Sequence, residues 1–414
     1  METKAQTLTF AIIINLDIDM QHLDLRYDLR GVSASKDEVH QAIKHLDKGL
    51  FPNAFCKVIP DIVVRDPDYC NIMHADTAGT KTSLAYIYWR ETGDISVWKG
   101  IVEDAIVMNL DDMGCIGCFD NIVLSSTIGR NKSLITGEIL STLINHTQDY
   151  IEKLANYGIG ITLAGGETAD VGDIVRTVDV GFTAFGRMKR SDVVDIHIQP
   201  GDYIVGFASY GQSIYEDEYN GGMGSNGLTS SRHDVFDKYY ADKYPESYNH
   251  HIPAEVVYTG SKRLTDAIDI HGKSIPIGKL VLSPTRTYLP IIKPIIEQHR
   301  NAIHGMIHCS GGGQTKVSKF MHPGIHIIKD NLFEIPPLFQ LIRQESGLSL
   351  YEMYQVFNMG HRLECYVSDL SAAEHMIGIA AGFDIEAKII GKVDRSNGKE
   401  ITIIHGEEKI YYQY

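Results

Sequence analysis

The chain has 414 residues, too many for one ordinary hydrophobic core, so we expect two domains of about 150–200 residues each. Its composition, 43% hydrophobic and 22% charged, is that of an ordinary globular protein whose size makes disulfide staples unnecessary. The formal net charge of −15 disfavours nucleic acid and anionic membrane surfaces, and we expect neither as a partner.

The six cysteines are spread along the chain and resemble no compact disulfide framework. This pattern favours a reducing compartment, and we expect the cytoplasm. Cys115 and Cys118 form a C-x-x-C without a second Cys or His pair, so we expect a structural role for them rather than zinc binding. The apolar run Phe10–Leu16 is too short to span a bilayer and lacks the flanks of a signal peptide. The run is either an added strand or part of an upstream extension of residues 1–19, with the working protein starting near Met20. We favour the extension and assign residues 1–26 to it.

Alternating strand-like and helix-like segments predict a two-domain protein of the α+β or α/β class. Strands are expected in the first half at Cys70–Asp76, Asn121–Ser126, Ile159–Ala164 and Val178–Arg187. Helices are expected at Trp98–Leu110 and Ile135–Tyr157. The chain turns polar near residue 190, and we divide it there into an N-terminal domain, 27–190, and a C-terminal domain, 191–414.

In the second half, strands are expected at Tyr203–Ala208, Ile303–Cys309, Leu363–Val367 and Ala387–Val393. Helices are expected at Thr285–His299, Pro337–Glu345 and Ser371–Ala381, and Pro290 and Pro294 should kink or shorten the first of them. Residues 212–260 are rich in Tyr, Asp, Glu, Asn and His. They predict a mobile loop that leads into a helix capped near Ser225 or Asn226.

A glycine-containing turn, His74–Lys81 (HADTAGTK), follows the first predicted strand. Its backbone N–H groups at Gly79 and Thr80 can bind phosphate oxygens, with Lys81 as a point charge and Asp76 as a magnesium ligand. The turn is not a Walker A loop, and the alternative is a plain glycine turn without a ligand. Both interpretations stay open on this motif alone.

A second glycine-containing segment, Gly165–Asp170 (GGETAD), also follows a predicted strand. Gly165 and Gly166 let the backbone approach a ligand closely, and Glu167, next to Thr168, can hold a metal or a nucleotide. This segment is a second candidate for the nucleotide site.

The predicted helix at 98–110 leads into carboxylates on an otherwise apolar surface. Asp104 and Asp111 are seven residues apart, two helical turns, and so share a face, with Asp112 beside them. Carboxylates are costly to bury unless a cation or hydrogen-bond donors satisfy them, and magnesium bridging to phosphates would do so. The alternative is that this end of the helix faces solvent.

Four short motifs follow in the second half: Ser225–Gly227 (SNG), Ser283–Tyr288 (SPTRTY), His308–Gly313 (HCSGGG) and Glu352–Gly360 (EMYQVFNMG). The first can bind a substrate phosphate at a helix N-terminus. The second places Arg286 in the first turn of a predicted helix. Each motif alone is weak, so the argument depends on their order.

In this order the motifs resemble those of the phosphoribosylformylglycinamidine cyclo-ligase family, also called aminoimidazole ribonucleotide synthetases. The resemblance runs from about Tyr27 to the C-terminus. The family pattern D-G-V-G-T-K corresponds to Asp76–Lys81, D-x-x-x-M-x-x-N-D to Asp104–Asp112, and G-G-E-T to Gly165–Thr168. S-N-G, P-T-R-x-Y, H-x-x-G-G-G and E-M-Y-x-x-F-N-M-G follow. P-T-R-x-Y and the last motif separate this family from relatives that make selenophosphate or phosphorylate thiamine phosphate.

The resemblance implies a homodimer whose N-terminal domains pair strands into a shared barrel, with a C-terminal α/β domain closing over the cleft. It also implies an enzyme of de novo purine synthesis. ATP would phosphorylate the formyl amide oxygen of formylglycinamidine ribonucleotide, and an amidine nitrogen would then close the imidazole ring. ADP and phosphate would be released. Mg²⁺ is the expected metal, and a need for K⁺ stays open.

Phosphoryl transfer asks for metal ligands and a cation, and the resemblance selects the same residues. The candidate metal ligands are Asp76, Asp104, Asp112 and Glu167. The ATP site would combine Asp76, Asp104 and Glu167 with Gly79, Thr80, Lys81, Gly165, Gly166 and Thr168.

Lys81 and His308 are the catalytic candidates, with His308 serving proton transfer or orienting the formyl amide. The candidate substrate ligands are Ser225, Asn226, Gly227, Arg286 and His308.

The chain departs from the family pattern at several positions. Thr77 replaces the second motif glycine, and Asp111 replaces an Asn. Many members carry a His directly before S-N-G, whereas this chain has Gly224, so His233 or a residue of the 212–260 loop would have to replace it. His361–Glu364 replaces a small apolar run after N-M-G. These changes indicate a divergent branch of the family.

Two other functions are compatible with the motifs. One is a relative with the same ATP fold that makes another acyl or amide phosphate. The other is a non-catalytic binding paralogue, which the retained acidic positions argue against.

Overall fold

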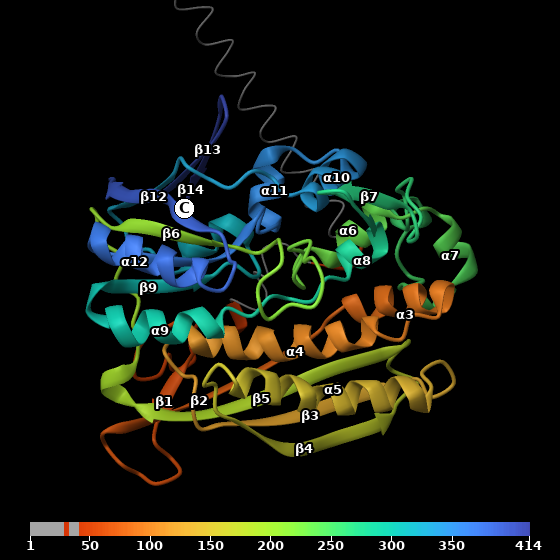
Figure 1. Ribbon diagram of the computed structural model, residues 1–414, viewed down its shortest axis with the longest axis horizontal. Helices are drawn as coiled ribbons and strands as arrows, with labels where there is room; N and C mark the ends of the chain where they lie inside the picture. The colour runs from red at the N-terminus through yellow and green to blue at the C-terminus, as the bar shows by residue number, and fades with distance from the viewer. Residues whose placement is uncertain (1–28, 33–40) are drawn as a thin grey trace, which may run out of the picture.

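The computed structural model describes residues 29–32 and 41–414, so the predicted extension lies outside the described residues. The described residues form a five-stranded sheet, a seven-stranded sheet and a two-stranded hairpin (Figure 1). None of the helices in these ranges combines the length and the apolar character that a membrane crossing requires. The two-domain α/β architecture that the sequence predicts is confirmed.

The five-stranded sheet belongs to the N-terminal half and has the strand order β1-β2-β5-β3-β4. Its strands are β1 (Val58–Pro60), β2 (Tyr69–Thr77), β3 (Ile122–Arg130), β4 (Ile161–Asp170) and β5 (Val178–Lys189). Three helices accompany it: α3 (Lys81–Thr92), α4 (Val97–Gly114) and α5 (Gly137–Ala155). The predicted strands and helices of this half are confirmed, but β4 continues through the GGETAD motif.

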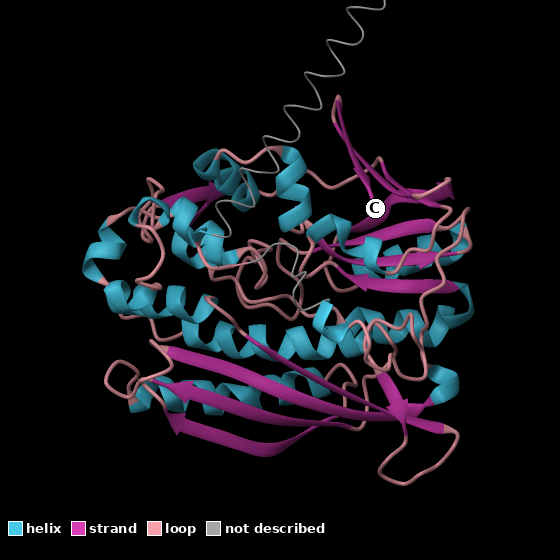
Figure 2. Cartoon of the chain, turned by 180° about the vertical axis from the view of Figure 1, so that it is seen from behind, coloured by secondary structure: helices cyan, strands magenta, loops and turns pink. Residues whose placement is uncertain are grey.

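Helices α4 and α5 lie on one face of the five-stranded sheet, and no described helix covers the other face (Figures 1 and 2). On that open face Met73 of β2 is 66% exposed and Val123 of β3 is 39% exposed. Among the described strands, β4 pairs with β3 alone, in parallel, which leaves its outer edge free. Apolar side chains and unpaired backbone groups on such a surface are typical of an interface.

The seven-stranded sheet belongs to the C-terminal half and has the order β14-β13-β10-β12-β6-β11-β9. Its strands are β6 (Tyr203–Ala208), β9 (Ile303–His308), β10 (Ile325–Lys329), β11 (His361–Val367), β12 (Ala387–Arg395), β13 (Lys399–His405) and β14 (Glu408–Gln413). The helices of this half are α9 (Leu289–His299), α10 (Pro337–Ser346), α11 (Leu350–Val356) and α12 (Leu370–Ala381). The first sheet ends at residue 189 and the second begins at 203, and the division near residue 190 stays our proposal.

Helix α9 begins at Leu289, four residues later than predicted. Pro290 lies in its first turn, where the missing N–H costs nothing because that group has no partner inside a helix. Residues 285–288 are left outside the helix and bond instead to carboxylates of α4. The prediction that Arg286 lies in the first turn of a helix is therefore wrong.

The segment between β6 and α9 holds more secondary structure than the predicted mobile loop. It contains α6 (Leu228–Val235), α7 (Tyr239–Lys243), β7 (Ala267–Ile270), β8 (Lys273–Pro276) and α8 (Ile277–Val281). Helix α6 begins after Gly227, whose φ of 74° is left-handed, and no side chain caps it. The predicted cap at Ser225 or Asn226 is therefore wrong. Phe236 and Tyr258 are fully buried, so the segment packs into the core.

Short 3-10 helices connect several elements: η1 (Arg190–Asp192), η2 (Pro245–Ser247), η3 (Ala254–Val256), η4 (Arg300–Ala302) and η5 (Gly313–Lys319). Helix α4 packs on β2 and β5 on one side and on α9 on the other, so it lies between the two halves (Figure 1). The alternative that its acidic end faces solvent is wrong for Asp104 and Asp111, which are buried.

Candidate active site

Lys81 is the first residue of α3 and forms a buried ion pair with Asp104 of α4, at 2.8 Å between Nζ and Oδ1. Both side chains are fully buried, and Nζ also donates to the Ser283 carbonyl at 2.5 Å. Burial lowers the pKa of Lys81 and raises that of Asp104, while the attraction between them opposes both shifts. Lys81, which we expected to bind phosphate, is thus paired in this structure with Asp104, a predicted metal ligand.

The PTRTY segment supplies further donors to the α4 carboxylates, a name we use for Asp104, Asp111 and Asp112. Asp104 accepts hydrogen bonds from the N–H and hydroxyl of Thr285 at 2.8 and 2.6 Å. Asp111 accepts from the Thr287 hydroxyl at 2.6 Å and from the backbone of residue 288 at 2.9 Å. These donors satisfy both oxygens of Asp111 and one oxygen of Asp104, whose Oδ2 has no partner in the described residues. Both threonines were missed as partners by the sequence analysis.

Asp112, the third carboxylate, is bridged by two histidines. Its Oδ1 lies 2.7 Å from Nδ1 of His308, at the end of β9, and its Oδ2 lies 3.4 Å from Nε2 of His74 in β2. Burial alone would raise the pKa of Asp112, but the hydrogen bonds from His308 and His74 hold it well below its usual range. Both carboxylate oxygens are therefore engaged within the chain.

The two histidines use their ring nitrogens differently. His74 Nδ1 lies 3.0 Å from Oδ1 of Asn109, whose amide group donates to backbone carbonyls, so this ring must donate at both nitrogens. Burial alone would lower the pKa of His74, but the bonds to Asp112 and Asn109 raise it. His308 Nε2 accepts from Nε of Arg362 at 3.2 Å, so Nδ1 is the ring nitrogen that donates to Asp112.

The remaining residues of the HADTAGTK turn lie beside α6. Asp76 is half-buried and accepts a hydrogen bond from the N–H of Thr77 at 2.7 Å, while Gly79 and Thr80 are exposed. The Thr80 hydroxyl lies 2.8 Å from that of Thr229, in the first turn of α6. The glycine turn and the start of α6 are thus adjacent, as a shared phosphate site requires.

The SNG motif lies next to the HCSGGG motif. A Cβ built on Gly311 would lie 3.4 Å from Oδ1 of Asn226. Ser225 is partly buried, and its hydroxyl has no hydrogen-bond partner within the described residues. The structure therefore places the HADTAGTK turn and the SNG and HCSGGG motifs around the start of α6.

Glu167 is far from these residues within one chain. Thr77, Gly181, Thr127 and Glu167 are aligned across the neighbouring strands β2, β5, β3 and β4. Three interstrand steps separate β2 from β4, about 14 Å. Residues 164–168 are exposed on β4. The structure does not bring Gly165–Thr168 to Asp76 or Lys81.

Arg286 is held by a carboxylate of its own chain. Its Nε and Nη2 donate to the two oxygens of Glu216 at 3.0 and 2.5 Å, and its Nη1 donates to the carbonyls of Ala208 and Tyr210. This bidentate pair occupies the fork of the guanidinium that would otherwise bind a substrate phosphate. In this structure Arg286 organises the 212–220 segment.

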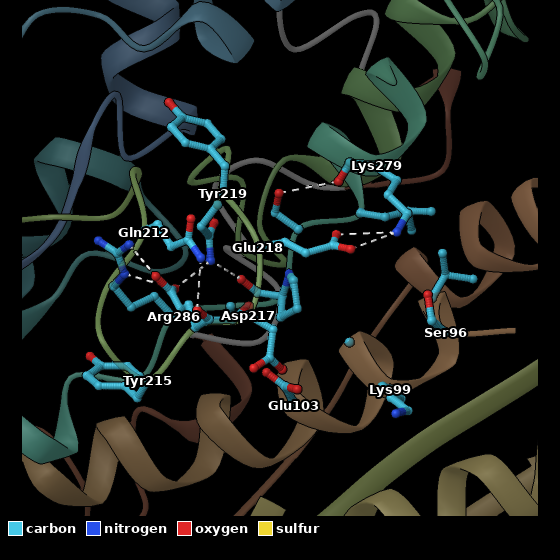
Figure 3. Close-up of a pocket in the computed structure, with 18 of the residues that line it drawn as sticks. Ser96, Lys99, Glu103, Gln212, Tyr215, Asp217, Glu218, Tyr219, Lys279 and Arg286 are labelled. Carbon is cyan, nitrogen blue, oxygen red and sulfur yellow. Dashed lines mark hydrogen bonds and ion pairs between the residues drawn. The ribbon is translucent and has the colours of Figure 1, made fainter. Parts of the chain in front are cut away.

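A cavity of about 750 Å³ is lined in part by residues 283–287 (Figure 3). Its labelled side chains come from α4, such as Glu103, from the 212–220 segment, such as Tyr215, and from α8, where Lys279 pairs with Glu218 at 3.1 Å. Of the predicted site residues within the described chain, Arg286 alone lines this cavity. The cavity is therefore adjacent to the motif cluster and shares the SPTRTY segment with it.

No group of three or more His, Cys, Asp or Glu side chains in residues 29–32 and 41–414 is placed to hold a metal ion. Two carboxylate oxygens of the predicted metal ligands have no partner among those residues. They are Oδ2 of Asp104, which is buried, and the second oxygen of Asp76. All six cysteines lie within these ranges and are free and buried. Burial raises the pKa of Cys118 to about 12, which makes it an inert core thiol.

Comparison with known families adds to this geometry. The N-terminal domain described as "AIR synthase related protein" matches residues 56–188, and the C-terminal domain of the same description matches 199–404. This chain belongs to the AIR synthase related protein family.

Two members of this AIR synthase family illustrate the similarity. The chain is 28% identical over 367 residues to a phosphoribosylformylglycinamidine cyclo-ligase of Methanococcus maripaludis, covering 88% of this chain and 87% of the other. It is 28% identical over 345 residues to the protein of the same name from Methanocaldococcus jannaschii, covering 81% and 82%. A chain of the HypE–HypF complex shares the fold, with a TM-score of 0.53, 15% identity and coverage of 92% and 100%.

Proposed function

We propose that this chain is an ATP-dependent cyclo-ligase that converts formylglycinamidine ribonucleotide to aminoimidazole ribonucleotide, with release of ADP and phosphate, in de novo purine synthesis. The observation that carries the proposal is the convergence of four separate motifs on α4 and the start of α6. HADTAGTK, SNG, SPTRTY and HCSGGG meet there although they are dispersed over 240 residues of sequence, from about 74 to 313. Relatives named for this activity align with most of the chain.

The residues can bind phosphates and orient the acceptor. The exposed backbone of Gly79 and Thr80 and the start of α6 offer N–H groups to phosphate oxygens, and Lys81 lies directly behind them. ATP would phosphorylate the formyl amide oxygen, the amidine nitrogen would attack the activated carbon, and phosphate would leave. His308 has both ring nitrogens engaged, which supports an orienting role rather than proton transfer.

Magnesium fits two of the four predicted ligands best. Asp76 and Asp104 each keep a carboxylate oxygen without a partner in the described residues, whereas both oxygens of Asp112 bond to histidines. Mg²⁺ held by Asp76 and Asp104 would neutralise phosphate charge.

A homodimer in which the five-stranded sheets pair into a barrel would cover the open face that carries Met73 and Val123 and the free edge of β4. In such a dimer, Glu167, which is remote from Asp76 in its own chain, can join the site of a second chain. The free buried thiols support the reducing environment of the cytoplasm, which we propose as the location.

The test is turnover. Purified protein is incubated with formylglycinamidine ribonucleotide, ATP and Mg²⁺, and ADP and aminoimidazole ribonucleotide are measured together. Asp76→Asn is expected to abolish both products without unfolding the protein, and Asp173→Asn, an exposed carboxylate of a turn, is the matched control. ADP release with a different acceptor only would overturn the proposal in favour of another acyl or amide phosphate. Absence of turnover with any acceptor would favour a non-catalytic paralogue.

A further inference from the structure

Arg362 of β11 is a buried arginine at the centre of the candidate site, with 2% of its surface exposed. Its Nε donates to Nε2 of His308 at 3.2 Å, and its Nη2 donates to the carbonyl of Arg286. The guanidinium lies 5.5 Å from the centre of the Tyr288 ring. These contacts fix the position of the guanidinium, but none of the contacting groups carries a negative charge.

No carboxylate in the described part of the chain lies within ion-pair distance of Arg362, and its Nη1 has no hydrogen-bond partner there. Arg286 and Arg30 are buried to a similar degree and are each paired with a carboxylate, Glu216 and Asp234 respectively. A buried cation without an anion is costly to maintain. Arg232 is also buried without an ion pair in the described residues. Arg362 differs in lying against His308 and beside the SNG motif, which indicates that its anion comes from the ligand.

The free Nη1 lies against Gly224, the residue before the SNG motif. A Cβ built on Gly224 would lie 3.2 Å from Nη1, so a side chain there would compete with the guanidinium for the same space. The carbonyl of Gly224 lies 3.4 Å from Nζ of Lys81. Gly224 and Arg362 are also two of the positions at which this chain departs from the family pattern, and the structure shows that they are in contact.

One other polar atom beside Gly224 lacks a partner among the described residues: Oγ of the adjacent Ser225. Donors from Arg362 and Ser225 are of the kind that bind phosphate oxygens, whereas the three N–H donors of the nearby Lys81 are all used within the chain. Asp112 holds His308, and His308 in turn holds Nε of Arg362, so the guanidinium is oriented before any ligand arrives.

We propose that Arg362 binds a phosphate group of the bound ligand, together with Ser225, beside Gly224. The identity of that ligand rests on the proposed function: the phosphate belongs either to ATP or to the ribonucleotide. His308 is then a positioning residue, which acts on the ligand through Arg362.

The test compares Arg362→Met, which keeps the buried volume and removes the charge, with Arg362→Lys, which keeps the charge and removes the fork. Arg343→Met, on the exposed surface of α10, is the control. The KM for ATP and the KM for formylglycinamidine ribonucleotide are measured separately. Arg362→Met is expected to raise one of the two KM values by about tenfold or more. Arg362→Lys should raise the same KM by less, and Arg343→Met should leave both KM values unchanged. The KM that rises identifies the phosphate.

Binding is measured independently of turnover by the rise in melting temperature that each variant shows with Mg²⁺ and a non-hydrolysable ATP analogue, with the ribonucleotide, and with inorganic pyrophosphate. Arg362→Met is expected to lose the rise given by one of these probes. If Arg362 is only structural, the melting temperatures with and without probe fall together and their difference is unchanged, which overturns the proposal. If the wild-type protein shows no turnover but binds a probe through Arg362, the proposed function fails and this inference stands.

Discussion

The α4 carboxylates and the Gly165–Thr168 segment of β4 both come from acidic motifs of the N-terminal half, but their surroundings are opposite. Asp104 and Asp111 are fully buried and receive donors from Thr285 and residues 287–288 of the other domain. Glu167 is exposed on an edge strand. Asp104 and Asp111 therefore have their main partners within one chain, whereas Glu167 lies on a strand whose outer edge is free among the described strands.

The difference separates two kinds of site residue. A buried carboxylate must be satisfied in the folded chain, so its loss or the loss of its partner should affect stability as well as activity. An exposed carboxylate is solvated and contributes little to stability, so its loss should affect activity alone. Measurements of stability and of turnover on the same variants can therefore confirm or break the comparison.

The largest effect is expected for Lys81→Met, because it leaves Asp104 buried without its cation. Unfolding in urea should show a loss of about 3–5 kcal/mol. The double variant Lys81→Met/Asp104→Leu should recover part of this loss, since it removes the stranded charge as well. Equal stability of the wild-type and Lys81→Met proteins would show that the pair is not buried as described.

A smaller effect is expected for Thr287→Val, which removes one donor from Asp111 and preserves the side-chain shape. We expect a loss of about 1–3 kcal/mol in the free energy of unfolding. The control is Thr162→Val on the exposed surface of β4, which should change stability by less than about 0.5 kcal/mol. Similar losses in the two variants would contradict the buried position of Asp111.

The Asp112–His74 pair should make stability depend on pH. The pKa of His74 is raised in the folded state, so the protonated ring adds to the free energy of unfolding at pH values below the pKa that His74 has in the unfolded chain. This stabilisation is lost as pH rises through the pKa of His74 in the folded chain. His74→Asn should remove this decline, which begins above the ordinary histidine pKa of about 6.5, measured by urea unfolding at each pH. An unchanged pH profile in the variant would show that the imidazolium makes no net contribution.

The smallest effect on stability is expected for Glu167→Gln, within about 0.5 kcal/mol of the wild type. Its turnover should nevertheless fall by about a hundredfold, if the exposed carboxylate joins the site of a second chain. Mixing Glu167→Gln with an inactive Asp76→Asn variant should restore part of the activity through mixed dimers. Failure of this complementation in a dimeric protein would place Glu167 outside the active site.

Much of the fold was predictable because the evidence for each element is local. Apolar residues at helical spacing predicted α4 and α5, and short apolar runs before glycines predicted β2 and β4. The ends were less predictable where a distant partner decides them. Helix α9 begins late because residues 285–288 bond to α4, and nothing within that segment indicates this use.

Within the site, the sequence identified residue types that suit phosphate chemistry but assigned some of them the wrong neighbours. Arg286 was expected at a substrate phosphate, and the structure pairs it with Glu216. Arg362 was noted only as a departure from the family pattern, and the structure places it against His308 and Gly224. An arginine fits either role by its chemistry, so the surrounding charges decide which one it takes.

By itself, the sequence determined the alternation of strands and helices, the order of the motifs and, through them, the family. Periodicity and the stereochemistry of glycine and proline act over a few residues, so these features are readable along the chain. Only the tertiary structure decided which donors reach the α4 carboxylates, because Asp111 and Thr287 are 176 residues apart. It also separated Glu167 from Asp76, since strand order in a sheet is set by packing and not by position in the sequence.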